Sequence, residues 1–342
     1  MSNNSFWQSL GAWLRAQGVV RVMRHGAYAR FIASSWVYTI GFWMQRIGVG
    51  WLTWELTHSG AWLGAVAMSY ALPAILLTPF AGAIADRMDR VRLLTISQGL
   101  QFLTGILLAG FTLADLAGVW LIMAIALVLG ILESMATPAR MTIAPNLVPR
   151  EDLSGAIGLN AVSFNSATFI GPAIAGAAIA SIGIGWTFAI SAAAFVPHFL
   201  VLLRTRLHTD EHGGRGTQSL LADIIEAVRY LAQHRGIAPV LAAAMVGSLL
   251  VRHLPELMPG FAGDVFALGP EGLGGLMSAF GAGGMLGSLW MANRNRVLGT
   301  TTIFFVGLLG NAAFVFAFAS TDIFLVGLAS LALFGFSMST SG

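Results

Sequence analysis

The feature that most constrains this chain is a succession of apolar runs, each about as long as a bilayer is thick. A helix needs roughly 20 apolar residues to cross the hydrocarbon core. Ten such runs occur along the chain. The predicted spans are residues 31–53, 62–85, 93–113, 119–138, 154–181, 185–203, 237–258, 272–292, 299–319 and 323–342. The series predicts an all-α integral membrane protein that crosses the bilayer many times.

The composition agrees with this class and excludes several others. Hydrophobic residues make up 56% of the chain and charged residues 10%, which is far from the usage of a soluble domain. The chain has no Cys, so it contains neither a disulfide framework nor a thiolate metal site. The net charge of +3 follows from the loops that flank the spans, so the lipid bilayer is an expected partner and nucleic acid is not.

The arginines predict the orientation of the chain in the membrane. Nearly all of them lie in the N-terminal segment, the 86–92 turn, the loop at Arg150, the 204–235 segment and the 294–296 turn. The loops between these segments lack Arg. Because basic loops stay on the cytoplasmic side, we expect a multi-pass protein of the inner membrane with a cytoplasmic N-terminus. No cleavable signal is visible in the first 30 residues.

The polar segments divide the chain into four parts. Residues 1–30 form a leader that is either an amphipathic helix at the cytoplasmic interface or a disordered basic segment. Residues 31–203 hold six predicted spans, and residues 236–342 hold about four more. Between them, residues 204–235 form a cytoplasmic linker with an apolar stripe over 219–232. Six spans, a linker and further spans are typical of two halves, each built from inverted three-helix repeats.

The turn between the second and third spans concentrates charge. Residues 86–92 contain Asp86, Arg87, Asp89, Arg90 and Arg92. A carboxylate at the C-terminal end of a helix faces the negative end of the helix dipole, so Asp86 needs a positively charged partner. Four residues earlier, Gly82 lacks a side chain and allows a second helix to approach closely.

This turn resembles the loop 2–3 signature of the major facilitator superfamily, Gly-x-x-x-Asp-Arg-x-Gly-Arg-Arg/Lys. Gly82, Asp86, Arg87 and Arg90 match it, whereas Asp89 stands in place of the second Gly and Arg92 follows one position later than the last base. The resemblance implies a gating latch between the two halves of a transporter. A weaker counterpart, Gly287 followed by Asn293-Arg-Asn-Arg296, lacks the acidic residue.

A second resemblance covers most of residues 31–335. The segments 137–153 and 160–176, together with Met44-Gln45-Arg46 and Trp51, are similar to the exporter branch that includes enterobactin-type siderophore and macrolide exporters. The element Gly171-Pro172-x-x-Ala-Gly176 resembles the antiporter motif of the fifth span. It serves either as a helix bend that matters for transport or as plain helix packing. Such transporters have twelve helices, so the chain is expected to be truncated after about ten.

Two charged side chains within the spans need an explanation, because a charge inside a membrane costs roughly 2.5–3.5 kcal/mol on insertion scales. Arg46, beside Gln45, either lines a substrate cavity or extends to the outer headgroups. Glu133 either joins the latch by pairing with Arg87, Arg90 or Arg140, which we favour, or carries protons.

Other polar residues are candidates for substrate or proton binding. Arg252, His253 and Glu256 form either such a site or an interfacial cap with an internal Arg252–Glu256 pair. Asn160 and Asn165 either contact substrate or bond across helices, and the same alternatives hold for Gln98 and Gln101. His198 is interpreted as a packed, hydrogen-bonded histidine, and His208 with His212 as part of a solvated loop rather than a metal site.

These patterns predict a secondary active transporter that exports a small amphiphilic compound by alternating access, with protons as the coupling ion. The sequence has no nucleotide-binding loop, nucleophile elbow or zinc-protease helix, so we expect neither an enzyme nor a cofactor. Two alternatives remain: a membrane sensor or assembly partner that keeps the fold without transport, and an importer of a metabolite. The substrate and the oligomeric state do not follow from the sequence.

Overall fold

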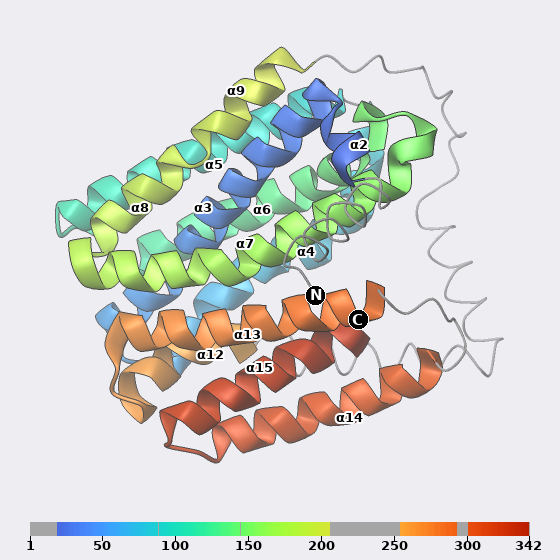
Figure 1. The fold of residues 1–342 in the computed structure, drawn as a ribbon. Helices are drawn as coiled ribbons and strands as arrows, with labels where there is room; N and C mark the ends of the chain where they lie inside the picture. Colours follow the sequence, from blue (N-terminus) through green and yellow to red (C-terminus); the bar gives the residue numbers. More distant parts are fainter. Residues whose placement is uncertain (1–18, 88, 144, 206–253, 293–299, 342) are drawn as a thin grey trace, which may run out of the picture.

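The computed structural model describes residues 19–87, 89–143, 145–205, 254–292 and 300–341 (Figure 1). In these ranges the chain is helical, and the helices run side by side in two groups. The first group contains α2 (Val19–Met23), α3 (Gly26–Thr57), α4 (Gly60–Arg87), α5 (Arg90–Leu113), α6 (Val119–Ile143), α7 (Leu153–Ile182), α8 (Ile184–Ala193) and α9 (Val196–Arg204). The second contains α12 (Leu254–Gly260), a π-helical turn (Phe261–Val265), α13 (Gly269–Ala292), α14 (Thr300–Ala319) and α15 (Phe324–Ser341).

The predicted spans and the observed helices agree closely where the structure describes both. By length and mean hydropathy, seven helical stretches in the described ranges qualify as membrane spans. They are Gly60–Leu77, Arg90–Leu113, Val119–Arg140, Arg150–Ile182, Ile184–Arg204, Thr302–Ala319 and Phe324–Ser341. Most of the predicted seventh span, the leader up to residue 18 and the linker segment 206–235 lie outside the described residues.

Two boundaries differ from the sequence-based prediction. Helix α3 begins at Gly26 rather than at residue 31, so part of the predicted leader belongs to the first long helix. The sixth predicted span is interrupted between Ala193 and Val196. Pro197 explains the interruption, because proline lacks a backbone N–H and its ring clashes with the carbonyl four residues earlier.

The contacts between helices of the first group follow an internal symmetry. When α8 and α9 are counted as one span, the first group has six spans. The first three spans, α3, α4 and α5, correspond in order to the last three, which are α6, α7 and the α8–α9 span. The observed pair α3–α7 then maps onto α6–α4, the pair α3–α8 maps onto α6–α5, and α5–α8 maps onto itself. This is the arrangement expected of two inverted three-helix repeats.

Both ends of the helix bundle can be recognised from the sequence. The arginine-rich end carries Arg30, Arg90, Arg140, Arg150 and Arg204. The opposite end carries the short connections α3–α4, α5–α6, α7–α8 and α14–α15. Near the opposite end, Trp120 and Trp186 are 71% and 57% exposed, as expected of amphipathic rings at a bilayer interface.

At the arginine-rich end, α2 is held against the start of α7. The carboxylate of Asp152 is buried and pairs with both Arg21 and His25, with 2.8 Å between His25 Nε2 and Asp152 Oδ2. One turn further on, the Tyr28 hydroxyl donates a hydrogen bond of 2.8 Å to the Ala156 carbonyl. These contacts hold the start of α3 close to the start of α7.

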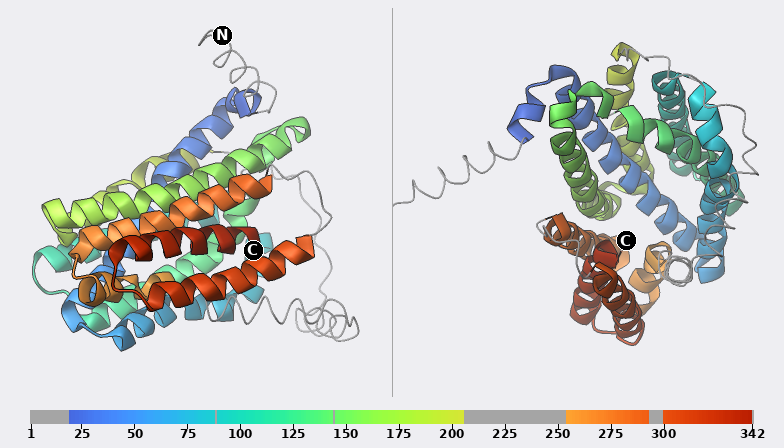
Figure 2. Two further views of the ribbon diagram at one scale, coloured as in Figure 1. Left: turned by 60° about the horizontal axis from the view of Figure 1, so that its bottom comes forward. Right: turned by 90° about the vertical axis from the view of Figure 1, so that its right-hand side faces the viewer.

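The two helix groups meet along α7 and α13, which lie side by side in both views of Figure 2. Close packing at this seam requires glycine. A Cβ atom added to Gly176 would lie 2.7 Å from Gly274 Cα, and one added to Gly281 would lie 2.7 Å from Phe169 Cα. Near the middle of the seam, the Ser278 hydroxyl donates a hydrogen bond to the Phe169 carbonyl.

We expect Gly176→Ala to lower the thermal unfolding midpoint of the purified protein, because the new methyl group would force α7 away from α13. Overpacking of this kind typically costs about 1–3 kcal/mol. Gly158→Ala is the matched control on the same helix, since a Cβ there would meet nothing within 4 Å. Equal midpoints for the two variants would show that the seam tolerates separation.

Candidate functional site

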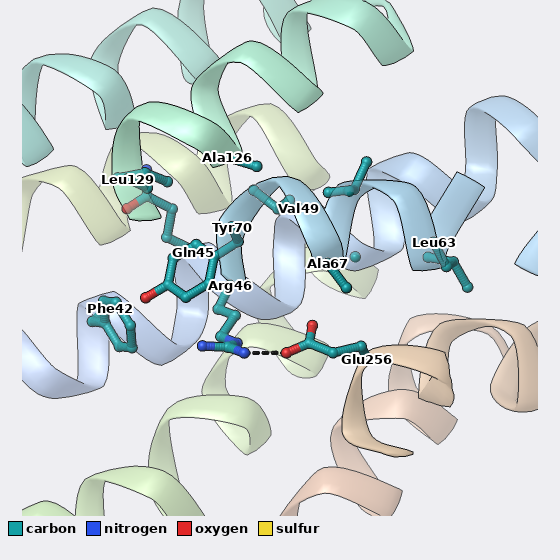
Figure 3. A pocket seen from close by; sticks show the side chains of 12 residues that line it. Phe42, Gln45, Arg46, Val49, Leu63, Ala67, Tyr70, Ala126, Leu129 and Glu256 are labelled. Carbon is teal, nitrogen blue, oxygen red and sulfur yellow. Dashed lines mark hydrogen bonds and ion pairs between the residues drawn. The ribbon is translucent and has the colours of Figure 1, made fainter. Parts of the chain in front are cut away.

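A cavity lies beside the boundary between the two helix groups, near the middle of α3 (Figure 3). It offers about 40 Å³ of space to the centre of a water-sized molecule. A single water needs about 10–15 Å³ by this measure, so the cavity has room for a few waters. Its apolar lining comes from α3, α4 and α6, namely Phe42, Val49, Leu63, Val66, Ala67, Ala126 and Leu129.

The polar part of the cavity contains one cation and one anion from different helix groups. Arg46 on α3 donates a hydrogen bond from Nη2 to the Glu256 Oε1 atom on α12, and the two side chains form an ion pair (Figure 3). The Arg46 side chain is 31% exposed and that of Glu256 22%. Because the Arg46 head group lies in the cavity and is paired, extension to the headgroups does not describe its position.

Two aromatic rings lie close to the Arg46 guanidinium. Its Cζ atom lies 4.6 Å from the centroid of the Tyr70 ring and 5.7 Å from that of Trp43. Cations are attracted to the faces of such rings, which holds the guanidinium in place without neutralising it. The neighbouring Gln45 is 2% exposed and also lines the cavity. Tyr70 gave no signal in the sequence, because a lone tyrosine in an apolar span is typical of ordinary packing.

Beside the cavity, α3 also contacts the second helix group directly. A Cβ atom at Gly50 would lie 3.1 Å from Pro259 Cγ. One turn further on, the Trp54 ring packs against Gly260 and Gly263, where added Cβ atoms would lie 3.2 Å and 2.3 Å from ring atoms. Only glycine at position 263 allows this approach, so α3 and the second helix group pack closely at this point.

Glu133 belongs to a different polar cluster, inside the first helix group. Arg140 Nη1 donates a hydrogen bond of 2.9 Å to Glu133 Oε1, and Nη2 donates one of 3.2 Å to Oε2. The same Nη2 donates to the Tyr38 hydroxyl at 3.1 Å, which in turn donates to Gln101 Oε1 at 2.7 Å. Arg140 is one of the three partners that the sequence offered for Glu133, and the structure shows this pair. Gln101 bonds across helices, as one of the two alternatives for it stated.

His198 lies against the Tyr38 ring and is fully buried. Its Nδ1 atom is 2.9 Å from the Ser34 hydroxyl, and its ring stacks on Tyr38 with 5.6 Å between centroids. A packed, hydrogen-bonded histidine is therefore what the structure contains at this position. Gln98 is also fully buried, and neither of its amide atoms has a hydrogen-bond partner among the described residues.

The charged turn is described only in part. Helix α4 extends through Gly82, Asp86 and Arg87, but the side chains of Asp86 and Arg87 and the surroundings of Gly82 lie outside the described part. Asp89, which departs from the signature, caps α5: its Oδ1 atom accepts hydrogen bonds from the backbone N–H groups of Val91 and Arg92 at 2.8 and 3.0 Å. Such a cap contributes about 1 kcal/mol to helix stability.

The remaining candidates are dispersed. Arg252 and His253 lie outside the described residues, and Glu256 pairs with Arg46. Asn160 is exposed on α7, and Asn165 Nδ2 donates to the Ala161 carbonyl of the same helix at 2.9 Å. Gly171 and Pro172 are buried, and a Cβ at Gly171 would lie 2.7 Å from Trp43 Cβ on α3. Gly171 thus packs α7 against α3, whereas Gly176 packs it against α13.

Solved structures with a similar fold include a transporter and a homologue of a transporter. The structure is similar to the nucleoside transporter NupG, with a TM-score of 0.69, 13% identity and coverage of 92% of this chain and 80% of that one. It is also similar to an inward-facing bacterial homologue of the lysosomal transporter Spinster, with a TM-score of 0.63, 15% identity and coverage of 92% and 73%. At these identities the similarity establishes the fold alone.

Sequence relatives include two transporters. The staphyloferrin A transporter of Staphylococcus aureus is 34% identical over 52% of this chain and 45% of its own length. The multidrug efflux pump Tap of Mycolicibacterium fortuitum is 31% identical over 77% of this chain and 67% of its own length. The chain therefore spans between about half and two thirds of these relatives. The family model for transmembrane secretion effectors matches residues 19–338, and the chain belongs to this family of major facilitator transporters.

Proposed function

We propose that the full-length protein exports a small amphiphilic compound across the inner membrane by alternating access, driven by protons. The observation that carries this proposal is the Arg46–Glu256 pair, which joins the two helix groups inside a mostly apolar cavity. Drug-sized ligands occupy pockets of roughly 300–1,000 Å³, far more than the cavity now offers, so the helix groups must separate to admit one. The similarity to an efflux pump supports export as the direction.

The proposal extends to the organisation of the chain. Residues 31–203 and 236–342 form the two moving halves, and residues 204–235 connect them in the cytoplasm, where the N-terminus also lies. Arginines at the arginine-rich end support this orientation. Gly82, Asp86, Arg87, Arg90 and Arg92 form the gating latch on this side of the membrane, and Gly171, Pro172 and Gly176 hold α7 between α3 and α13.

An efflux assay with siderophores and macrolides tests the proposal. Cells that express the full-length protein should expel at least one of these compounds, and an uncoupler should stop the efflux because it dissipates the proton gradient. Asp86→Asn should slow the efflux while leaving membrane insertion intact, since it removes the charge of the latch. Efflux that ignores the uncoupler would refute proton coupling, and unchanged efflux by Asp86→Asn would refute the latch.

A further inference from the structure

The Arg46 guanidinium has more hydrogen-bonding capacity than the protein uses. A guanidinium carries five N–H donors. In the described part of the chain, its recorded hydrogen bond is the one from Nη2 to Glu256. The side chain is nevertheless 31% exposed, so the other donors face the cavity rather than a packed interior.

A second donor beside Arg46 is also unused. Gln45 is 2% exposed and lines the same cavity, and its Nε2 atom has no hydrogen-bond partner among the described residues. This nitrogen is itself buried, and a Cβ atom added to Gly105 on α5 would lie 3.5 Å from it, so it faces α5 rather than the cavity. The donors that the cavity offers are therefore those of Arg46.

The rings beside Arg46 add a preference for flat, apolar groups. Tyr70 and Phe42 line the cavity, and the Trp43 ring centroid lies 5.7 Å from the guanidinium Cζ atom. Planar carboxylates match the fork of a guanidinium, which can bind both carboxylate oxygens at once. The combination of donors and rings therefore suits an aromatic carboxylate better than a cation, for which Glu256 is the one charged partner described in the cavity.

We propose that Arg46 binds the carboxylate of an aromatic, amphiphilic acid, and that this carboxylate replaces Glu256. The inference deepens the proposed function and rests on it, because it names the substrate class of that same cavity. Replacement frees Glu256 and removes the ion pair between α3 and α12 beside the Gly50–Pro259 contact. Binding of the acid therefore favours separation of the helix groups at the opposite end, which is the step that an exporter must make only when loaded.

Titration calorimetry with benzoate tests the exchange on the purified full-length protein. Glu256→Gln should bind benzoate about tenfold more tightly than the unmodified protein, because the competing carboxylate is gone. Arg46→Gln should lose the binding, and Arg46→Lys should retain part of it. Benzamide has the same ring without the charge, and its binding should be equally weak in all four proteins.

Two results would overturn the inference. Benzoate affinity that is unchanged in both Glu256→Gln and Arg46→Gln would show that neither charge takes part. Binding of benzylamine that is lost in Glu256→Gln and strengthened in Arg46→Gln would show that the cavity selects cations instead. Circular dichroism and gel filtration of each variant separate these results from misfolding. Efflux by the unmodified protein is measured in parallel. If the protein exports compounds but its benzoate binding does not depend on Arg46 and Glu256, the inference is refuted and the proposed function is not.

Discussion

Arg46→Gln is expected to reduce efflux by the full-length protein at least about thirtyfold, the largest effect of any single substitution in the cavity. The substitution removes the cation to which the proposed substrate binds, and loss of one partner from a desolvated, hydrogen-bonded charge pair costs about 2–5 kcal/mol. Both side chains keep some solvent access, so the lower end of this range applies. About 1.4 kcal/mol corresponds to a factor of ten in rate.

Arg30→Gln is the matched control for this experiment. Arg30 lies on the same helix but is exposed at the arginine-rich end, far from the cavity. Arg46→Lys should fall between the two, because it keeps the charge but loses the planar contact with the Tyr70 ring. Equal efflux rates for Arg46→Gln and Arg30→Gln, at equal amounts in the membrane, would contradict a role for Arg46 in transport.

Removal of either partner of the Glu133–Arg140 pair is expected to destabilise the protein by about 2–3 kcal/mol. Each substitution leaves the other charge unpaired in the first helix group, a loss that costs about 3–5 kcal/mol where both charges are fully buried. The two side chains are 21% and 23% exposed, which reduces the penalty. Thermal unfolding of Glu133→Gln and Arg140→Gln in detergent measures the effect.

A double-mutant cycle separates the pair from its surroundings. Glu133→Gln combined with Arg140→Gln should cost less than the sum of the single changes, because neither charge is then left alone. Arg150→Gln, at an exposed position of the same end, should leave the unfolding midpoint nearly unchanged. Additive effects in the cycle would mean that the two side chains do not stabilise each other.

The sequence predicts the helices well because bilayer thickness imposes a length on every span. It does not show the interruption after Ala193, since an apolar run looks continuous even where Pro197 breaks the hydrogen-bonding pattern. The apolar length of the spans also places Arg46 and Glu133 inside them. The free-energy cost of a charge in the membrane then identifies both as residues that need partners.

The partners themselves are harder to predict. Glu133 and Arg140 are seven residues apart, two turns of one helix, so local spacing suffices to suggest the pair. Arg46 and Glu256 are 210 residues apart, so local spacing does not suggest their pairing. Only the packing of α3 against α12 brings the two charges together. Likewise, the cap that Asp89 forms depends on where α5 begins, which hydropathy does not determine.

The central claim is that the two helix groups separate at the opposite end in every transport cycle. Residues 1–342 contain no Cys, so in a full-length protein from which any cysteine outside this range has been removed, Gly50→Cys with Pro259→Cys introduces a single disulfide between the two helix groups. Efflux by the full-length double variant should stop when the disulfide forms and return when it is reduced. Full efflux by the oxidised, cross-linked protein would contradict the claim.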